Sequence, residues 1–410
     1  MMHSRRRIGI AALPLLVSLA HGACAARPDA PAEAAEARSG PLRGRLQARL
    51  DSLHASGSTP GATVGIALPD GRTMGLATGW ADTARRVRMT PDAQLLQGSV
   101  GKTYAAAVAM QLVAEGKLDL AAPISRYLGG EPWFDRLPNA REITVRMLMN
   151  HTSGLQRYEF DGRFLRDLAR DPYREWSPEA RLAYLFDRAA PFPAGEGWDY
   201  SDTNYIVLGM IIERLAGRPY YEELRHRILA PLRLHGTVPS DRPRLARLAQ
   251  GYAGPDNPFG GNDAMIGPDG RLAFNPQMEW TGGGIASTAE DLARWARLLY
   301  EGHAFDPALL PTVLDGVPAK LGRDARYGLG VILRPTPLGP SYGHSGYFPG
   351  YLTEVMYFPE HRVAVAVQFN TSARGSPEHS PARLLLEMAR IVVDEAGSGG
   401  RAGAGEQLPR

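Results

Sequence analysis

The chain has 410 residues, 44% of them hydrophobic, which is enough for one large domain or two medium domains with a substantial core. The formal net charge is only +3, and the 46 basic and 43 acidic side chains are interspersed rather than gathered in blocks. No basic patch with interleaved aromatic residues occurs, so the composition argues against nucleic acid as a partner.

The first 25 residues have the order of an export signal. The basic residues 5–7 precede an apolar run over 8–20, and small residues follow up to Ala25. The run is too short to span a membrane as a mature helix, and cleavage after Ala25 suits the small residues there. The same start can also be read as a twin-arginine signal. The sequence therefore predicts export to the periplasm or the extracellular space, with no membrane span.

Cys24 is the only cysteine. It either leaves with the leader or becomes the lipid-bearing first residue of the mature protein, although His21 fits a lipoprotein cleavage site poorly. In both cases the folded body has no disulfide and no thiol nucleophile. Residues 26–42 are rich in Pro, Ala and Glu and lack an apolar period, which predicts a disordered tether.

Hydrophobic periodicity predicts the elements that follow. We expect a helix over 41–56, strands over 62–68 and 73–80 joined by a hairpin, a helix from Ser99 to Gly116, helices over 204–216 and 220–230, a helix opened by Thr288, strands over 327–333, 351–358 and 363–369, and a closing helix over 381–394. Residues 393–410 are expected to form a loose tail.

Strands near both ends of the chain with helices between them predict an α+β fold. The sheet would be built from both chain ends, and hairpin-style connections would make it largely antiparallel, with helices on its flanks. The folded domain is expected to span residues 43–392. A mostly helical domain, about residues 100–282, would be inserted into it.

The first chemical signal is a lysine. Only three lysines occur among the 46 basic residues, and one of them, Lys102, closes the tetrapeptide Ser99-Val100-Gly101-Lys102. If this segment opens a helix, the serine hydroxyl and the lysine amine lie one turn apart on one face. A desolvated lysine can act as a base, whereas arginine cannot. Ser99 and Lys102 together are therefore the minimum set of groups for covalent catalysis.

Other segments of the sequence could contribute side chains or backbone groups to such a site. They are residues 143–155 (Ile-Thr-Val-Arg-Met-Leu-Met-Asn-His-Thr-Ser-Gly-Leu), 197–209 with Tyr-Ser-Asp-Thr-Asn-Tyr, the glycine-rich 282–288, and Gly-His-Ser-Gly at 343–346 before an apolar strand region. In order and spacing these segments resemble the penicillin-recognising serine hydrolases, which include class C β-lactamases, D,D-carboxypeptidases, and related esterases and D-amino-acid peptidases. The resemblance runs from about residue 45 to 392.

The resemblance implies a β-lactamase/transpeptidase-like fold and a catalytic role for three residues at matching positions. Ser99 would be the acylated nucleophile, and Lys102 would be its partner. Tyr200 would stand for the tyrosine of the family's Y-x-N motif and relay a proton to and from the Ser99 oxygen. Whether the lysine or the tyrosine takes the first proton stays open at this point. No cofactor is implied.

Further positions would bind the substrate. His344, Ser345 and Gly346 would replace the more common Lys-Thr-Gly, and the backbone N–H groups of Ser99 and Tyr347 would form the oxyanion hole.

Two substitutions depart from the family pattern. Asp202 stands where the family usually has Asn, and His344 replaces a permanent cation with a group that is mostly neutral above about pH 6.5. We therefore expect weak attraction to carboxylates, improving as the pH falls through roughly 6.5. Residues 201–203 could alternatively be aligned with the S-D-N motif of other family branches.

Two other sequence motifs are matched only in part. Residues 98–103 resemble a phosphate-binding loop, but Leu96 stands where that pattern needs glycine. Residues 343–347 resemble a nucleophile elbow, but Tyr347 replaces its last glycine, and the strand–helix alternation of an α/β-hydrolase is missing. No metal-ligand spacing occurs, so no metal is expected. His151 is interpreted as a residue that shapes its loop.

The sequence as a whole predicts an exported serine hydrolase that forms an acyl-enzyme on Ser99. Its substrates would be small molecules or peptides with ester or D-amino-acid-type amide bonds, and β-lactams are a further candidate. The competing hypotheses are a true class C-like β-lactamase and a catalytically silent ligand-binding module on the same fold. The intact Ser99, Lys102 and Tyr200 argue against the silent module.

Overall fold

The computed structural model describes residues 30–260, 263–373, 375 and 377–402. The chain divides into two compact units, Met1–Pro41 and Leu42–Arg410. The described part of the first unit is helical, and the account below concerns the second unit. The predicted export signal and Cys24 lie outside the described residues. Within the described ranges, no helix combines the length and the apolar character that crossing a membrane requires.

The helices are distributed along the whole described chain. The α-helices are α1 (Ala30–Ala55), α2 (Lys102–Ala114), α3 (Ser125–Leu128), α4 (Val145–Met149), α5 (Gly162–Arg170), α6 (Pro178–Leu182), α7 (Asp202–Ala216), α8 (Tyr220–Leu224), α9 (Ala289–Tyr300), α10 (Leu310–Leu314) and α11 (Pro381–Ala402). Shorter turns of helix are η1 (Gly98–Gly101), η2 (Phe134–Arg136), η3 (Tyr158–Phe160), η4 (Arg225–Leu229), η5 (Pro276–Met278), η6 (Trp280–Gly282), η7 (Pro307–Leu309) and η8 (Pro377–His379).

Most of the strands lie towards the two ends of the sequence. They are β1 (Gly61–Ala67), β2 (Thr73–Asp82), β3 (Val87–Arg88), β4 (Leu95–Leu96), β5 (Val238–Pro239), β6 (Ile285–Ser287), β7 (Val317–Pro318), β8 (Arg326–Tyr327), β9 (Ile332–Thr336), β10 (Gly339–Phe348), β11 (Tyr351–Phe358) and β12 (Val363–Phe369).

The described strands form a nine-stranded antiparallel sheet in the order β3-β2-β1-β12-β11-β10-β9-β8-β7, and a small sheet β4-β6-β5. The first hairpin closes on the last strand, since β1 pairs with β12 and Ala62 lies opposite Phe369. Every residue of β1 and β12 is buried, as expected for central strands covered on both faces. The predicted α+β fold, with a largely antiparallel sheet from both chain ends, is confirmed.

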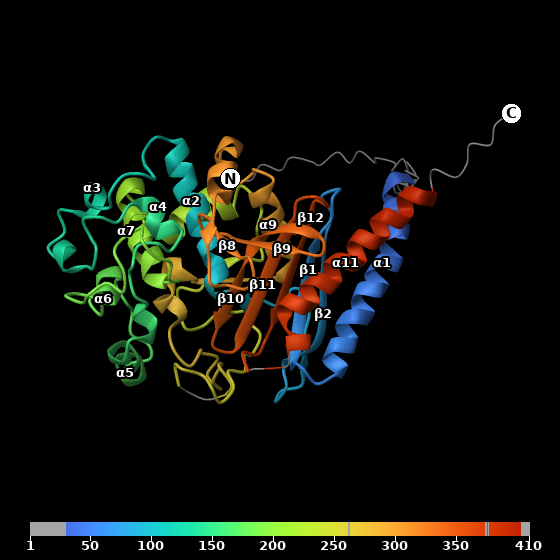
Figure 1. The fold of residues 1–410 in the computed structure, drawn as a ribbon. Coiled ribbons are helices and arrows are strands. Elements are labelled where there is room, and N and C mark those ends of the chain that lie inside the picture. Colours follow the sequence, from blue (N-terminus) through green and yellow to red (C-terminus); the bar gives the residue numbers. More distant parts are fainter. Residues whose placement is uncertain (1–29, 261–262, 374, 376, 403–410) are drawn as a thin grey trace, which may run out of the picture. The chain divides into compact units, whose positions relative to one another are not determined.

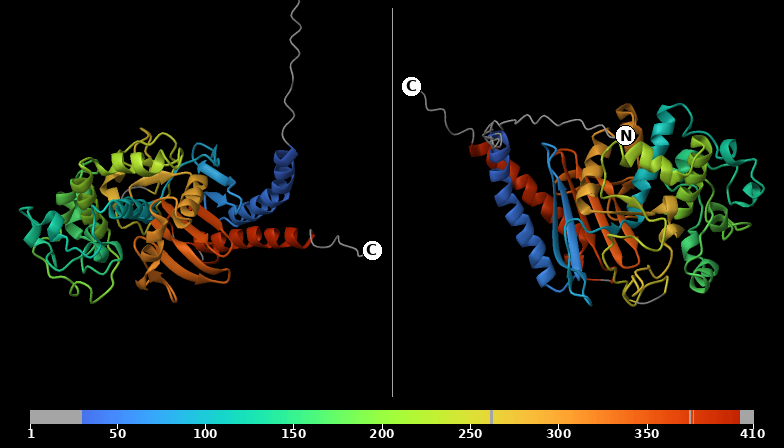
Figure 2. Two further views of the ribbon diagram at one scale, coloured as in Figure 1. Left: turned by 90° about the horizontal axis from the view of Figure 1, so that it is seen from above. Right: turned by 180° about the vertical axis from the view of Figure 1, so that it is seen from behind.

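Helices cover both faces of the large sheet (Figure 1). On one face, α11 and the part of α1 that follows Pro41 pack leucines such as Leu46, Leu50 and Leu385 against β1, β2, β11 and β12. On the other face α9 lies against β1, β11 and β12. The helices between α2 and α8 gather beyond that second face, on the side of the sheet away from α11, as the two further views show (Figure 2).

Three expectations need correction. Residues 30–42 are helical rather than a disordered tether, because Ala, Glu and Arg are strong helix formers even where the segment has no apolar stripe. Residues 393–402 continue α11 instead of belonging to a loose tail, and Glu395 there pairs with Arg45 of α1 at 2.6 Å. The strand expected over 327–333 is two short strands, because Gly330 has a positive φ of 77° and turns the chain between β8 and β9.

Candidate functional site

Ser99 and Lys102 lie at the start of a largely buried helix, α2. Ser99 sits in the short turn η1, and α2 begins at Lys102, one turn later. Ten of the thirteen residues of α2 are buried, among them Lys102 itself, so the helix is fixed by packing all round. The Lys102 amine donates to the Ser99 hydroxyl at 3.1 Å, which is the proximity expected from the sequence.

Two glycines allow the Ser99 turn to press against strand β10. A Cβ on Gly346 would overlap the backbone carbonyl oxygen of Gln97, and a Cβ on Gly98 would overlap the carbonyl oxygen of Tyr347. Gly98 also has a positive φ of 51°, which favours glycine. The motif glycine at 346 is therefore needed for the close approach that brings Ser99 and the 344–347 segment to one place.

Lys102 is fully buried and contacts three oxygen atoms. Besides Ser99, it donates to the Gly282 carbonyl oxygen at 2.5 Å and to the Asp202 carboxylate. Burial by itself lowers the pKa of the Lys102 amine, but the Asp202 charge and Tyr200 outweigh it, and the net shift is upward. The pKa of Asp202 is raised by burial and lowered more strongly by Lys102 and Arg157. At neutral pH the pair is therefore an ammonium ion and a carboxylate.

Tyr200 approaches the same lysine from the turn before α7. Lys102 Nζ lies 4.9 Å from the centroid of the Tyr200 ring. The phenol oxygen is buried and makes no hydrogen bond of normal geometry with a described residue. Burial raises the pKa of Tyr200, against the opposing effects of Lys102 and Ser99, so the phenol is neutral. Ser201, by contrast, turns away and donates to the Gln156 carbonyl oxygen at 3.0 Å, which favours the Tyr200 alignment over the S-D-N alignment.

His151 holds the segment that carries Tyr200. Its Nδ1 atom accepts hydrogen bonds from the backbone of Ser201 at 3.3 Å and from the Asn204 amide at 2.9 Å. The ring lies 4.2 Å from that of Tyr200, centroid to centroid. The residue has a left-handed φ of 65°, a conformation that the surrounding packing has to maintain. These contacts agree with the loop-shaping role interpreted from the sequence.

The Gly-His-Ser-Gly segment lies inside strand β10 rather than before a strand. His344, Ser345 and Gly346 pair with residues 353–355 of β11. His344 is 1% exposed; its Nδ1 lies 2.6 Å from the Ser345 carbonyl oxygen, which can only accept, so Nδ1 carries the proton. Its Nε2 then accepts from the Tyr327 hydroxyl at 2.8 Å.

The expectation that His344 titrates near pH 6.5 is wrong. Burial, together with the charge of Lys102, lowers the pKa of His344 to about 3. The imidazole is therefore neutral throughout the physiological range, and it cannot supply a positive charge to an anionic substrate.

Two arginines that the sequence did not single out stand close to these residues. Arg334 on β9 donates to Glu354 at 2.5 Å and to the Ser345 hydroxyl at 3.0 Å. Arg157 donates through Nε to Glu159 at 2.6 Å. Arg157 and Glu159 directly follow the His-Thr-Ser-Gly-Leu segment, and this two-residue spacing of opposite charges was the available signal. Arg334 lies ten residues before His344 and carries no motif.

Ser99 opens onto a cavity of about 460 Å³. Its lining brings together the positions predicted from the sequence and the newly found ones: Ser99, Arg157, Tyr200, His344, Ser345, Gly346, Tyr347 and Glu354. Asp202 and Lys102 lie behind this surface, in contact with each other. The size suits an amino-acid or dipeptide derivative.

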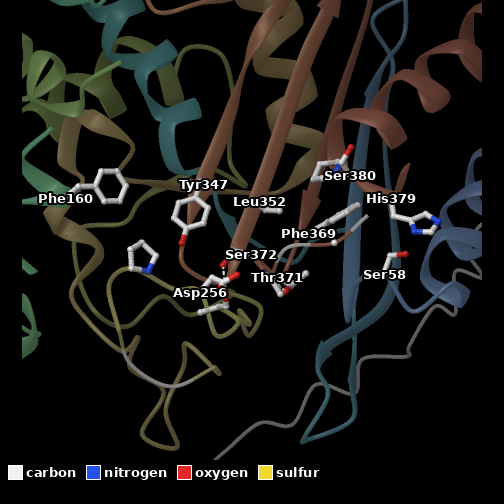
Figure 3. A pocket seen from close by; sticks show the side chains of 15 residues that line it. Ser58, Phe160, Asp256, Tyr347, Leu352, Phe369, Thr371, Ser372, His379 and Ser380 are labelled. Carbon is white, nitrogen blue, oxygen red and sulfur yellow. Dashed lines mark hydrogen bonds between the residues drawn. The ribbon is translucent and has the colours of Figure 1, made fainter. Parts of the chain in front are cut away.

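A second cavity, of about 630 Å³, adjoins the first and shares Tyr347, Leu352 and Ser380 with it. Figure 3 shows the Tyr347 hydroxyl directed toward Ser372, with the Phe160 ring on the side of Tyr347 away from Leu352. Tyr347 is 37% exposed and therefore stands between the two spaces. Within the described ranges, no group of three or more His, Cys, Asp or Glu side chains is placed to hold a metal ion.

The neutral state of His344 has a direct spectroscopic consequence. We expect its imidazole to remain neutral from pH 8 down to pH 5, because protonation would bury a charge beside Lys102. Nitrogen-15 spectra of the histidine rings, with the His344→Gln variant to assign the signal, measure this. A protonation midpoint between pH 6 and 7 for that signal would contradict the buried environment.

Glu159 is expected to make stability fall as the pH rises. Burial and the Asp202 charge raise the pKa of its carboxyl to about 7, from an ordinary value of 4.5, against the effect of Arg157. Because the folded-state pKa is the higher one, the unfolded state ionises first, and stability is lost between these two values. The loss amounts to about 3 kcal/mol above pH 7.

Urea unfolding at pH 5 and pH 8 measures this effect. Wild type should lose about 2 to 3 kcal/mol more between the two pH values than the Glu159→Gln variant, since part of the loss has already occurred at pH 5. Replacing the exposed Glu142 by glutamine is the matched control and should follow the wild type. An equal loss in the Glu159→Gln variant would show that the carboxyl is ionised in the folded state like an exposed one.

The Beta-lactamase family model matches residues 46–390. Penicillin-binding protein 4 of Amycolatopsis lactamdurans is 30% identical over 370 residues, covering 85% of this chain and 91% of the relative. The D-aminopeptidase of Brucella ovis is 25% identical over 350 residues, covering 81% of this chain and 60% of the relative, so this chain spans well under two thirds of that enzyme.

Solved structures of similar proteins share the fold. The D-amino acid amidase from Ochrobactrum anthropi SV3, in complex with L-phenylalanine amide, is 25% identical with a TM-score of 0.73, covering 88% of this chain and 99% of the other. A D-stereospecific amidohydrolase from Streptomyces sp. is 26% identical with a TM-score of 0.68, and the match covers 82% of this chain and 96% of the other. The resemblance drawn from the motifs is thereby confirmed: the chain belongs to the beta-lactamase family, the penicillin-recognising serine hydrolases.

Proposed function

We propose that the protein is an exported serine hydrolase that is acylated on Ser99 and cleaves ester or D-amino-acid-type amide and peptide bonds. The observation that carries this proposal is the buried Lys102 amine at 3.1 Å from the Ser99 hydroxyl, beside the Tyr200 phenol and at the wall of a cavity of suitable size.

Proton movement begins at the Lys102–Asp202 pair. Because Lys102 starts as an ammonium ion, it has to lose a proton before it can accept one, and Asp202 is the carboxylate in direct contact with it. This transfer to Asp202 runs against the pKa shifts of the pair, so the neutral amine is a minor species; when it forms, it takes the proton of Ser99 as the serine oxygen attacks the substrate carbonyl carbon. Asp202, which stands where the family usually has Asn, would thus serve as the proton acceptor for Lys102.

The remaining steps restore the starting protonation state of Lys102, Asp202 and Tyr200, while one proton departs with the leaving group and is later replaced from water. Tyr200 donates its phenol proton to the leaving group as the bond to it breaks, Lys102 reprotonates the phenolate, and Asp202 returns its proton to Lys102. Water then attacks the acyl-enzyme by the reverse relay, which restores the Ser99 hydroxyl and releases an acid. The backbone N–H groups of Ser99 and Tyr347 would stabilise the tetrahedral oxyanion in both half-reactions.

The substrate class rests on the similar proteins. Their names include a D-aminopeptidase, a D-amino acid amidase and a penicillin-binding protein, all of which point to D-amino-acid derivatives or their β-lactam mimics. Export rests on the basic, apolar and small-residue order of the first 25 residues. Sequencing the amino terminus of the mature protein tests the export signal, and we expect it to begin after Ala25.

A substrate panel tests the activity. A D-amino-acid amide, a D-alanyl-D-alanine peptide, a short-chain nitrophenyl ester and the β-lactam nitrocefin are compared by kcat/KM. We expect turnover of the ester and of at least one D-amino-acid derivative, with nitrocefin the slowest. Rapid nitrocefin turnover would instead indicate a true β-lactamase. No turnover and no covalent labelling by a fluorophosphonate would indicate a silent ligand-binding module.

A further inference from the structure

Two buried acids lie near the Lys102–Asp202 pair and take no part in the proposed reaction steps. Glu159 and Glu279 are 3% and 7% exposed, and each has a buried carboxyl oxygen without a hydrogen-bond partner among the described residues. A fully ionised carboxylate in such a place is costly, because nothing donates to that oxygen. Each acid is therefore expected to carry a proton or to share one with a neighbouring group.

Glu159 is held beside Asp202 by hydrogen bonds between two segments. The Gln156 carbonyl oxygen accepts from the hydroxyl of Ser201 at 3.0 Å and from that of Thr203 at 2.7 Å. The first backbone N–H of η3 donates to the Thr203 hydroxyl at 3.3 Å. The chain around η3 is thus tied to the residues on either side of Asp202. As a result, the carboxyl groups of Glu159 and Asp202 lie within hydrogen-bonding reach of each other.

Two carboxyl groups in this arrangement hold one proton between them. An ionised carboxylate can only accept, so a hydrogen bond between Glu159 and Asp202 requires a proton on one of them. Lys102 contacts Asp202, and Arg157 donates to Glu159 at 2.6 Å. Burial and the Asp202 charge raise the pKa of Glu159 to about 7, whereas the pKa of Asp202 is lowered. The shared proton therefore belongs to Glu159 below that pH.

The other groups around Glu159 do not change this assignment. Burial raises the pKa of Glu279 well above its ordinary value, and the charges of Asp202 and Glu159 add to that shift. The charged and titratable groups that face Glu159 are Arg157 and the buried phenol of Tyr158 on its own segment, Asp202 of α7, Lys102 of α2 beyond it, and Glu279 between η5 and η6.

A proton that leaves Lys102 is held better by Glu159 than by Asp202. The pKa of Glu159 lies about where an acceptor at neutral pH needs it, and that of Asp202 is lowered further by Lys102 itself. The amine is fully buried and has no direct path to bulk water. Asp202 contacts Lys102 on one side and reaches Glu159 on the other, so it can pass the proton between them.

We propose that Glu159 is the acceptor of the proton that Lys102 has to lose: it shares a proton with Asp202 and, once ionised, takes up the Lys102 proton through Asp202. An N–H bond of Lys102 breaks, an O–H bond forms on Glu159, and Asp202 is a carboxylate before and after the transfer. Deacylation returns the proton along the same path. Glu159 is a positioning residue that acts through Asp202. The inference rests on the proposed function and adds the group that governs its pH dependence.

The pH dependence of acylation follows from this transfer. While Glu159 is protonated, the neutral amine forms only by releasing a proton to solvent, and its share rises about tenfold per pH unit. Once Glu159 is ionised, the proton moves within the protein and the share of neutral amine no longer depends on pH. The acylation rate should therefore rise up to about pH 7 and level off above it.

Fluorophosphonate labelling rates from pH 5.5 to 9 test the proposal. This reaction reports the attack of Ser99 alone, because fluoride leaves without a proton from Tyr200. The wild-type rate constant should change by less than about twofold between pH 7.5 and pH 9. Glu159→Gln cannot take up a proton, so its rate constant should keep rising, by about tenfold or more over the same interval.

Matched variants make the outcome specific. Glu279 is buried in the same cluster but interacts with Asp202 through charge alone, so Glu279→Gln should level off like the wild type. The exposed Glu142 gives a second control, Glu142→Gln, with the same expectation. Thermal melts at both pH values show that each variant is folded. A wild-type rate that keeps rising, levelling that survives Glu159→Gln, or levelling lost instead in Glu354→Gln would overturn the proposal.

An infrared titration detects the proton itself. With carbon-13 in the glutamate carboxyl groups of the wild type, we expect a carboxylic acid band that disappears with a midpoint near pH 7 and is missing in Glu159→Gln. A protein that is labelled but lacks this band keeps the proposed function and loses the inference. A protein that is never labelled loses the proposed function and the transfer from Lys102, and the band then decides only whether the shared proton exists.

Discussion

Replacing Ser99 by alanine is expected to abolish covalent labelling and to lower kcat for any substrate by at least about ten-thousandfold. The serine oxygen is the atom that would form the acyl bond, and no neighbouring group can replace it. The fold should persist, because Lys102 keeps its contacts with Asp202 and Gly282 and only one hydrogen bond is lost. Intact-protein mass spectrometry after exposure to a fluorophosphonate measures the labelling.

Ser345 supplies the control for this experiment. It lines the same cavity, but its hydroxyl is bound to Arg334 and not to Lys102. Ser345→Ala should therefore still be labelled, at Ser99. An adduct that remains in Ser99→Ala, or that maps to Ser345 in the wild type, would remove Ser99 as the nucleophile.

Lys102→Arg is expected to be nearly as damaging as Lys102→Ala, with a loss of kcat/KM of about a hundredfold or more. A guanidinium group stays protonated at all relevant pH values and cannot take part in the exchange with Asp202 and Ser99. It is also larger, and the amine sits in a fully buried place among three oxygen atoms. Acylation rates by stopped flow and thermal melts separate the chemical loss from any loss of stability.

Lys117→Arg is the matched control, since its side chain is 51% exposed and pairs with Glu115 at the surface. This variant should behave as the wild type in both measurements. Near-normal acylation by a folded Lys102→Arg protein would mean that Lys102 acts only as a fixed charge and that the proton is accepted elsewhere.

The features that could be predicted from the sequence are those that depend on short-range residue patterns. Short, largely apolar runs predicted strands 351–358 and 363–369 with the bounds that β11 and β12 have. The three-residue spacing of Ser99 and Lys102 depends only on one helical turn, and the structure places their side chains together. A three-residue spacing within one continuous turn of helix does not depend on how distant segments pack.

The electrostatic state of the site could not be predicted in this way. The pKa of His344 depends on burial and on Lys102, which is 242 positions away in the chain, so no pattern near His344 could report it. The raised pKa of Glu159 depends on its burial and on Asp202, which comes from a separate segment. Such properties arise only when separate segments are packed together.

The pairing of β1 with β12 also bears on when the enzyme becomes active. Val64 lies opposite Val367 in the middle of the large sheet, so the central strands cannot be completed until the chain has been synthesised as far as β12. Strand β10, against which the Ser99 turn is pressed, belongs to the same late-forming sheet. A growing chain that still lacks β10 therefore holds Ser99 and Lys102 without the strand against which the Ser99 turn packs, and we expect reactivity only after these strands have paired.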